Sequence, residues 1–428
     1  MATDPSTIPL SRNRDAGTNG PAPSRMAMAQ PVAGEPRIAA TRYRWRDPTT
    51  LPQLPWVFGR YFLRGVVTAV VSPGGVGKTT WLAGTALSIV SGKPLLGKAP
   101  WDGEGRVWIW NLEDDLDQLS RVIQAGALHF NLDEASLGDR LFVDSAMEGA
   151  GLSTATEQDG FKLLAPVFDA ITAELIKRQI DVLIIDPFVS SHDVDENANT
   201  KIDSIAKAWG RVAKAANAAI VLVHHTRKLA GQKVTSEQSR GAVSLINAAR
   251  IALVLNRMDE AEAERFGIEG DDERRRHFSV QDDKHNRAPP EKADWFRMAS
   301  VELGNGDNIG VAERWTPKDA FDGLTGAHLY RVQLAIAEGE HREDLQSPAW
   351  AGNAVALVLG LDPRAKSDRG RIRKLIDAWL VEGALEIVER ADATRRLRKF
   401  ITVGRWQNDP SAPPSQGGAE HGGAAEQR

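Results

Sequence analysis

A glycine-rich segment near residue 75 has the residue types of a phosphate-binding loop. Residues 72–80 read Ser-Pro-Gly-Gly-Val-Gly-Lys-Thr-Thr, after a strand predicted at 66–71 and before a predicted helix. Glycines let backbone N–H groups turn inward around a phosphate, and the helix N-terminus adds partial positive charge. In such a motif Lys78 reaches the β- and γ-phosphates of a nucleotide, and the Thr79 hydroxyl is placed to ligate Mg²⁺. A glycine-rich turn that binds no ligand is the alternative interpretation.

The whole loop is predicted to bind the nucleotide. The predicted binding residues are Ser72, Pro73, Gly74, Gly75, Val76, Gly77, Lys78, Thr79 and Thr80. The common form of the motif begins with glycine, and Ser72 departs from it.

Hydrolysis of a nucleotide also needs a metal ligand and a group that activates water. Asp186 ends an apolar segment, 181–186, at the sheet edge where open α/β folds place their ligands, and we interpret it as the second Mg²⁺ ligand. Glu113 follows a strand predicted at 106–110 and is interpreted as the general base. The alternative for Glu113 is a solvated helix start, because acids are favoured at helix N-termini.

Strands and helices that would position these groups alternate along residues 43–317, the predicted ATPase core. Continuous apolar segments separated by helix-length segments predict a mostly parallel sheet covered on both faces, which is an α/β fold. Further strands are predicted at 218–225, 250–255 and 277–286. Residues 1–42 and 407–428 lack apolar periodicity and are predicted to be disordered.

A small basic domain is predicted at residues 344–406, after a linker at 318–343. Between Arg364 and Arg405 the chain has twelve lysines and arginines against six acids. Two predicted helices and a basic two-stranded hairpin after Gly383 are typical of a winged helix, a shape that binds nucleic acid. Winged helices also form protein contacts, so DNA and a protein are both possible partners of this domain.

Composition excludes several other kinds of site. The 428-residue chain has no cysteine, which excludes disulfides, cysteine-ligated zinc, iron–sulfur clusters and cysteine nucleophiles. A formal net charge of −4 excludes a protein that is basic along its whole length. The chain has no apolar run of transmembrane length and no apolar signal segment, so we expect a cytoplasmic protein without a membrane partner.

Six ordered motifs resemble those of the RepA-like hexameric replicative helicases of plasmids, within the RecA- and DnaB-type ATPases. The resemblance covers about Phe62 to Trp295 and includes the loop with serine at its first position. The further motifs are Glu113-Asp114, the strand ending in Asp186 with Glu196-Asn197 beyond it, His224-His225, Ser239-Arg240-Gly241 with Arg250, and Lys284-x-Asn286 with Ala288-Pro289. The resemblance implies a RecA-like P-loop NTPase core that binds ATP and Mg²⁺ and assembles into a homo-oligomeric ring, a hexamer.

The resemblance also implies roles for residues beyond the loop. His224 and His225 end a predicted buried strand, where His225 would sense the γ-phosphate; an ordinary strand end is the alternative. Arg250, predicted at the far edge of the core, would act on a neighbour's nucleotide as an arginine finger, with Arg240 as the second candidate. A surface arginine is the alternative for both. The polar loop 226–239 would bind single-stranded DNA in the channel of the ring, unless it is merely solvated.

Together these features predict Mg²⁺-dependent ATP hydrolysis coupled to DNA binding and translocation. The expected protein is a ring-forming replicative DNA helicase of a plasmid, phage or mobile element. The alternative is an ATP-switched DNA-binding regulatory protein that does not unwind DNA. A P-loop phosphotransferase is disfavoured, because Glu113 implies water as the nucleophile and no acceptor-binding lid stands out.

Overall fold

The computed structural model describes residues 39–226, 233–235, 243–285, 287, 291–317, 319–391 and 395–407. The chain divides into two compact units, Met1–Gln53 and Leu54–Arg428. In the first unit, the described residues 39–53 are exposed and include the 3₁₀ turn Pro48–Thr50. Most of the two ends predicted to be disordered lies outside the described residues.

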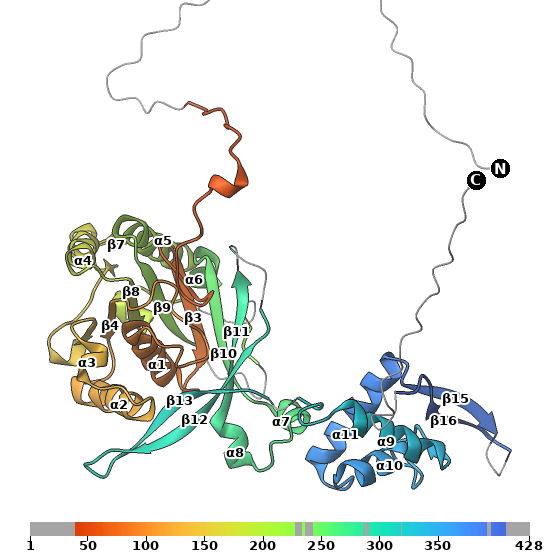
Figure 1. The fold of residues 1–428 in the computed structure, drawn as a ribbon. Coiled ribbons are helices and arrows are strands. Elements are labelled where there is room, and N and C mark those ends of the chain that lie inside the picture. The colour runs from red at the N-terminus through yellow and green to blue at the C-terminus, as the bar shows by residue number, and fades with distance from the viewer. Residues whose placement is uncertain are drawn as a thin grey trace, which may run out of the picture. The chain divides into compact units, whose positions relative to one another are not determined.

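A nine-stranded sheet forms the centre of the second unit (Figure 1). Its strands are β3 (Val67–Pro73), β4 (Val107–Asn111), β5 (Leu141–Ser145), β8 (Val182–Asp186), β9 (Ala219–Thr226), β10 (Ile251–Arg257), β11 (His277–His285), β12 (Asp294–Glu302) and β13 (Asn308–Trp315). They are hydrogen-bonded in the order β13-β12-β11-β10-β3-β9-β8-β4-β5. Neighbours from β10 to β5 are parallel, and neighbours from β10 to β13 are antiparallel. The predicted α/β fold with a mostly parallel sheet is therefore confirmed, whereas the β12–β13 hairpin is not among the predicted strands.

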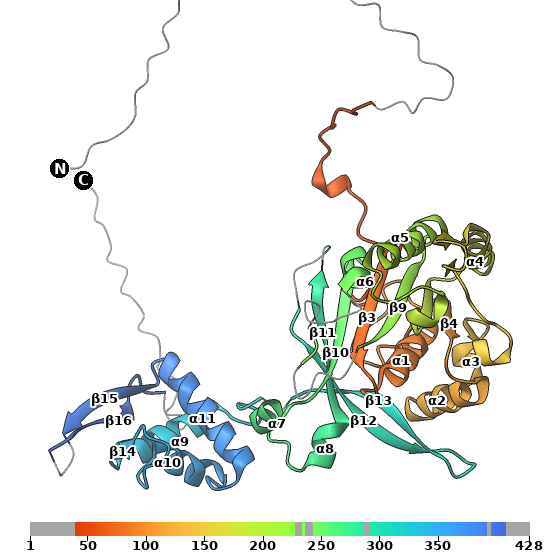
Figure 2. The ribbon, with the colours of Figure 1, turned by 180° about the vertical axis from the view of Figure 1, so that it is seen from behind.

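Helices cover both faces of this sheet, as the two opposite views show (Figures 1 and 2). They are α1 (Lys78–Ser91), α2 (Leu116–His129), α3 (Glu134–Leu137), α4 (Ala165–Arg178), α5 (Asn199–Ala216) and α6 (Val243–Ala248). The short helices α7 (Glu260–Phe266) and α8 (Asp271–Arg276) lie in the segment that joins β10 to β11. Successive residues of β8 enter different cores: Leu183 and Ile185 share one with Trp209 of α5, and Ile184 shares the other with Trp81 of α1. Both tryptophans are fully buried. The strands are thus apolar on both faces, which explains their continuous apolar sequences.

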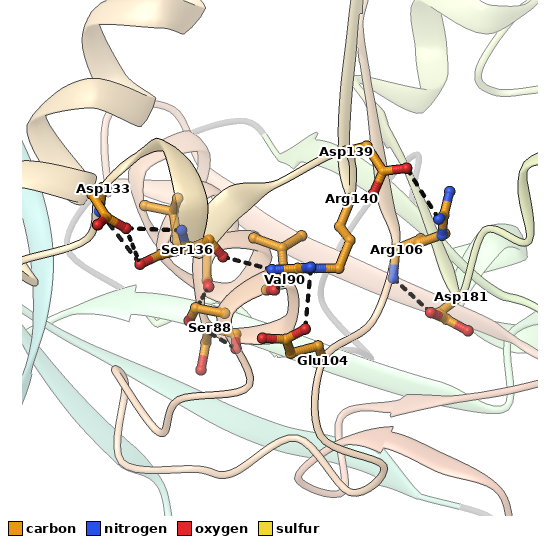
Figure 3. A network of polar contacts seen from close by, with 11 residues as sticks. Ser88, Val90, Glu104, Arg106, Asp133, Ser136, Asp139, Arg140 and Asp181 are labelled. Atoms are coloured by element: carbon orange, nitrogen blue, oxygen red, sulfur yellow. Dashed lines mark hydrogen bonds and ion pairs between the residues drawn. The ribbon is translucent and has the colours of Figure 1, made fainter.

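Arg106 and Arg140 make polar contacts at the end of the sheet where β4, β5 and β8 begin (Figure 3). The backbone N–H of Arg106 donates to Oδ2 of Asp181 at 2.6 Å. Nε of Arg140 donates to the carbonyl of Val90 near the end of α1 at 2.8 Å, and its guanidinium lies 3.1 Å from the Glu104 carboxylate. These contacts stabilise the end of the sheet at which the strands begin, opposite their carboxyl ends.

Two antiparallel pairs of short strands lie outside the main sheet. They are β1 (Trp56–Phe58) with β2 (Phe62–Leu63), and β6 (Ala155–Thr156) with β7 (Lys162–Leu163). Within the described ranges, no helix combines the length and the apolar character that crossing a bilayer requires.

The C-terminal part of the chain forms its own apolar core. Its elements are α9 (Gly326–Ala337), β14 (His341–Arg342), α10 (Ala351–Leu359), α11 (Lys366–Val381), β15 (Leu385–Ala391) and β16 (Leu397–Val403). The strands form an antiparallel sheet in the order β14-β16-β15. Ile372 and Trp379 of α11 are buried in the core that this sheet and the three helices share.

The prediction of a linker at 318–343 is wrong, because α9 and β14 belong to this C-terminal domain. Val332 and Ile336 of α9 are buried in its core. The side chain of Gln333 is fully buried as well, and its Nε2 donates to the carbonyls of Ala384 and Arg405, both at 2.9 Å. A polar glutamine on the buried face of α9 weakens the apolar pattern, which explains why the helix is not evident from the sequence.

Candidate active site

The segment that joins β3 to α1 is the predicted phosphate-binding loop. Because α1 begins at Lys78, the unpaired N–H groups of its first turn lie at this loop. Gly75 and Gly77 have φ values of +75° and +111°, which L side chains rarely adopt. A Cβ on Gly77 would also stand 3.1 Å from Sδ of Met298 in β12. The backbone conformation therefore favours glycine at 77, the side chain of Met298 leaves little room for a Cβ, and the helix N-terminus that follows favours an anion.

Other side chains of the loop maintain its shape. Ser72 is fully buried, and its Oγ donates to the carbonyl of Pro73 at 2.9 Å. Val76 is buried in the core that contains α1. Oγ1 of Thr80 donates to the carbonyl of Gly77 at 2.8 Å. Serine at the first position is therefore accommodated inside the fold, and contact with a phosphate falls to the backbone, Lys78 and Thr79.

Asp186 lies beside the loop at the end of β8. Its Oδ2 accepts a hydrogen bond from Oγ1 of Thr79 at 3.3 Å. Burial raises the pKa of Asp186 to about 6, and the nearby charge of Lys78 opposes that shift. A hydroxyl and a carboxylate suit Mg²⁺, which usually completes its shell with phosphate oxygens and water. Among the described residues, no group of three His, Asp or Glu could hold a metal ion.

Glu113 is presented at the end of β4 by a turn built on Asn111. The buried Oδ1 of Asn111 accepts hydrogen bonds from the N–H groups of Glu113, at 2.8 Å, and Asp114, at 2.7 Å. The N–H of Leu112 donates to the carbonyl of Asp186 at 2.8 Å, which ties the end of β4 to the end of β8. The side chain of Glu113 is 54% exposed. Asn111 is not among the predicted site residues, although an asparagine that opens a turn is a recognisable signal.

Lys78, His225 and Glu113 form a chain of polar contacts across α1, β9 and β4. Nζ of Lys78 lies 2.8 Å from Nδ1 of His225, and Nε2 of His225 lies 3.6 Å from Oε2 of Glu113. Burial lowers the pKa of Lys78 to about 8, against the charges of Asp186 and Glu113. Burial and then the charge of Lys78 lower the pKa of His225 to about 4. At pH 7 His225 is therefore neutral: Nδ1 accepts from the ammonium, and Nε2 carries the proton that faces Glu113.

His224 does not join this chain, because successive residues of a strand point to opposite faces. Its ring is 3% exposed, and its Nδ1 has no hydrogen-bond partner in the described part of the chain. Burial lowers the pKa of His224 to about 4, so the ring is neutral at pH 7. Of the predicted sensor pair, the structure brings His225 alone to Lys78 and Glu113.

Arg250 lies at the sheet edge opposite the phosphate loop. Its N–H donates at 3.1 Å to the carbonyl of Val67, the first residue of β3, whereas the loop follows Pro73 at the other end. A strand of this length spans roughly 20 Å, so Arg250 cannot reach its own loop. The prediction that the strand after Arg250 is the outermost strand of the core is wrong. β10 lies inside the sheet, because three antiparallel strands, β11, β12 and β13, continue beyond it.

Lys284 of β11 lies at the same edge as Arg250. Its Nζ donates to the carbonyls of Ile246, Asn247 and Ala249 at 2.9–3.1 Å, which satisfies the C-terminal end of α6. Burial and the charge of Arg250 both lower the pKa of Lys284. Outside the described residues lie Ser239, Arg240, Gly241, Asn286, Ala288 and Pro289, which belong to motifs of the resemblance.

Of the predicted DNA-binding loop, 226–239, only its first residue and 233–235 are described. Nζ of Lys233 lies 3.1 Å from the carboxylate of Asp259 and also pairs with Glu262. In this structure the Lys233 ammonium therefore pairs with two carboxylates, although the loop that contains it is predicted to bind single-stranded DNA.

β10 ends beside the phosphate loop with two polar residues that the sequence analysis does not single out. Oδ1 and Nδ2 of Asn256 form hydrogen bonds with the N–H and the carbonyl of Val234, both at 2.9 Å. The guanidinium of Arg257 donates to the carbonyl of Gly75 in the loop. A polar residue at the carboxyl end of an apolar strand is the signal that identifies Asp186. For Arg257, the same signal points to the site only when the strand order is known, because that order places β10 next to β3.

Residues 34–231 match the model of a family described as an AAA domain. The match includes the phosphate loop, Glu113, Asp186 and His225, and it ends before β10. It supports an AAA-type P-loop ATPase in this part of the chain, with ATP as the nucleotide. Strands β10–β13 and the C-terminal domain lie outside the matched residues.

Proposed function

We propose that this protein, built on an AAA-type ATPase domain, is a ring-forming DNA helicase. In this proposal Mg²⁺-dependent ATP hydrolysis drives translocation along single-stranded DNA during replication of a plasmid, phage or mobile element. The replicative context rests on the resemblance of the ordered motifs, and the chemistry rests on the site.

The observation that carries the hydrolytic proposal is the position of Glu113, next to His225 and Lys78 at the mouth of the loop. A water molecule attacks the γ-phosphorus and gives its proton to Glu113, while the bond to the β–γ bridging oxygen breaks and ADP leaves with the electron pair. Lys78 and the loop N–H groups offset the charge on the phosphates. Thr79 and Asp186 would hold Mg²⁺, which supplies further positive charge at the β- and γ-phosphates.

His225 fits a role as the reporter of the γ-phosphate. In the structure, Lys78 donates to its Nδ1. A bound triphosphate draws the lysine to itself, because an ammonium binds a phosphate oxygen more strongly than a neutral imidazole. The imidazole of His225 then keeps only its contact with Glu113. His225 belongs to β9, which continues into the loop 226–239, so the change could be passed to that loop.

Two features support DNA as the partner. The C-terminal domain runs helix, strand, helix, helix and hairpin, with the sheet order β14-β16-β15, which suits a winged helix. Three basic side chains of this domain are exposed, as phosphate contacts require: Arg373 of α11, and Arg395 and Lys399 in the β15–β16 hairpin. The single-stranded DNA contact of the loop 226–239 is proposed from its resemblance to channel loops.

The ring is supported by the position of Arg250. Arg250 is exposed and lies at the opposite end of the strands from its own loop, so a nucleotide that it contacts would belong to another subunit. Arg240 is the second candidate for the same role. A hexamer is the assembly that the resemblance implies.

Strand displacement on a forked DNA duplex with ATP tests the proposal, together with the mass of the particle. ATP-dependent separation by an oligomer, absent in Lys78→Ala, is expected. An ATP-switched regulator without unwinding activity is the second candidate, and it is favoured by the pairing of Lys233 with Asp259 and Glu262. ATP hydrolysis and DNA binding without any displacement would select the regulator.

A further inference from the structure

We propose that Arg257 is a nucleotide ligand that acts in cis: its guanidinium binds the phosphate chain of the ATP held by the loop of its own subunit. The inference rests on the proposed ATPase function and adds a residue that lies outside the motifs of the loop, of β4 and of β8.

The register of the sheet brings Arg257 to the loop. β10 runs parallel to β3, and Val254 is paired with Val71. Arg257 follows Val254 by three residues, just as the loop follows Val71, so both lie beyond the same end of the strand pair. Its guanidinium donates to the carbonyl of Gly75, and Nη2 lies 3.6 Å from the place where a Cβ on Gly75 would stand. The side chain thus reaches the loop from the β10 side, whereas His225 and Asp186 lie on the other side of β3.

The charge of Arg257 is available to a ligand. The residue is exposed, and no carboxylate in the described ranges pairs with it. Lys233 contrasts with it, because its ammonium pairs with two carboxylates. One hydrogen bond to the Gly75 carbonyl leaves most of the five guanidinium N–H donors unused. An arginine that contacts the phosphate loop and pairs with no carboxylate in the described ranges suits an anion of several charges.

A purely structural role would not need this charge. Any neutral donor could hold the carbonyl of Gly75. A triphosphate at the loop would offer oxygens for a bidentate contact with the guanidinium, which a neutral side chain cannot match. The loop carbonyl therefore holds the side chain in place for a nucleotide.

Four variants of the full chain separate charge from loop support: Arg257→Lys, Arg257→Gln, Arg257→Ala and the control Arg211→Ala, which removes an exposed arginine of α5. The dissociation constant for a non-hydrolysable fluorescent ATP analogue is measured for each. We expect Gln and Ala to weaken binding roughly tenfold to a hundredfold, Lys to recover part of it, and Arg211→Ala to bind like the wild type. Affinity of Arg257→Gln within twofold of wild type, or Arg257→Lys as weak as Arg257→Ala, overturns the proposal.

Mixing subunits tests action in cis. Arg257→Ala is mixed with an excess of Lys78→Ala, and ATP turnover is measured. A residue that acts in cis gives no recovery, because neither kind of subunit has a complete site. Recovery at any ratio overturns the proposal, since the arginine of Lys78→Ala would then serve a neighbour. A wild-type protein without ATPase activity would contradict the proposed function instead, so the two failures are distinguishable.

Discussion

The ammonium of Lys78 lies 2.8 Å from Nδ1 of His225, on the ring whose other nitrogen faces Glu113. One neutral imidazole thus connects the cation that would bind the phosphates to the carboxylate that would activate water. A phosphate oxygen bound by Lys78 would compete with this histidine for the N–H donors of the ammonium.

Lys78→Ala is expected to abolish ATP hydrolysis, because the terminal phosphates lose their point charge. Binding of a fluorescent nucleotide should weaken as well. Lys177→Ala on the exposed face of α4 is the matched control and should retain wild-type turnover. Unchanged turnover in Lys78→Ala would show that the phosphate loop is assigned wrongly.

Nucleotide affinity should depend on pH through Lys78. Burial lowers its pKa to about 8, so the nucleotide-free protein loses the ammonium as the pH rises above 8. Because a phosphate needs the charged form, each further pH unit should weaken binding up to roughly tenfold, whereas affinity between pH 6.5 and 7.5 should change little. Titration of a fluorescent ATP analogue from pH 6.5 to 9.5 measures this. In Lys78→Arg the loss above pH 8 should disappear, since arginine stays charged.

Glu113→Gln should separate binding from chemistry. Glutamine keeps the shape and a hydrogen bond but cannot accept the proton of water. We expect near-normal affinity for the ATP analogue and turnover reduced roughly a hundredfold or more. Turnover within a few-fold of wild type would place the base elsewhere, and Asp114, which shares the Asn111 turn, is then the next residue to change.

The ATP turnover of Arg250→Ala should be restored in part by subunits whose phosphate loop is disabled. Mixed with an excess of Lys78→Ala, whose Arg250 is intact, it should recover turnover wherever the two meet in the correct order. ATPase rate against mixing ratio, under conditions that allow subunit exchange, is the measurement. No recovery at any ratio, with mixed rings verified by mass, would contradict the finger in trans and remove the main support for a ring.

The buried ring of His192 should make the fold sensitive to acid. The ring packs edge-on against Phe188 with centroids 4.9 Å apart, and burial lowers its pKa from 6.5 to about 4. The unfolded chain binds the proton more readily, so the stability contributed by this residue is complete above pH 6.5 and falls as the pH drops toward 4. Between pH 7 and pH 5, the free energy of unfolding of the wild type should fall by about 2 kcal/mol more than that of His192→Phe, as measured by urea unfolding. Equal losses in both proteins would show that His192 does not titrate in this way.

The sequence predicts those parts of the site whose signals are local. The glycine-rich loop, the acid after β4 and the acid after β8 each follow directly from neighbouring residues. Asn256 and Arg257 end an equally apolar strand, but their place beside the loop depends on β10 pairing with β3. No local pattern encodes that order.

The same limit explains the two errors in the fold. The strand with Arg250 is taken as an edge because the β12–β13 hairpin, which extends the sheet, has fewer β-branched residues than the parallel strands. The helix α9 is taken as a linker because Gln333 occupies a buried position whose partners, Ala384 and Arg405, lie far along the chain.

β10 carries one arginine just before its start and another at its last residue, and it is hydrogen-bonded to β3 on one side and to β11 on the other. A strand held on both sides cannot slide alone, so it moves together with the sheet. If Arg250 serves a neighbour and Arg257 its own subunit, then every β10 touches two nucleotides at once. Loss of a phosphate from one nucleotide would then change a contact of the strand that also contacts the other, so hydrolysis at one site would influence the neighbouring site.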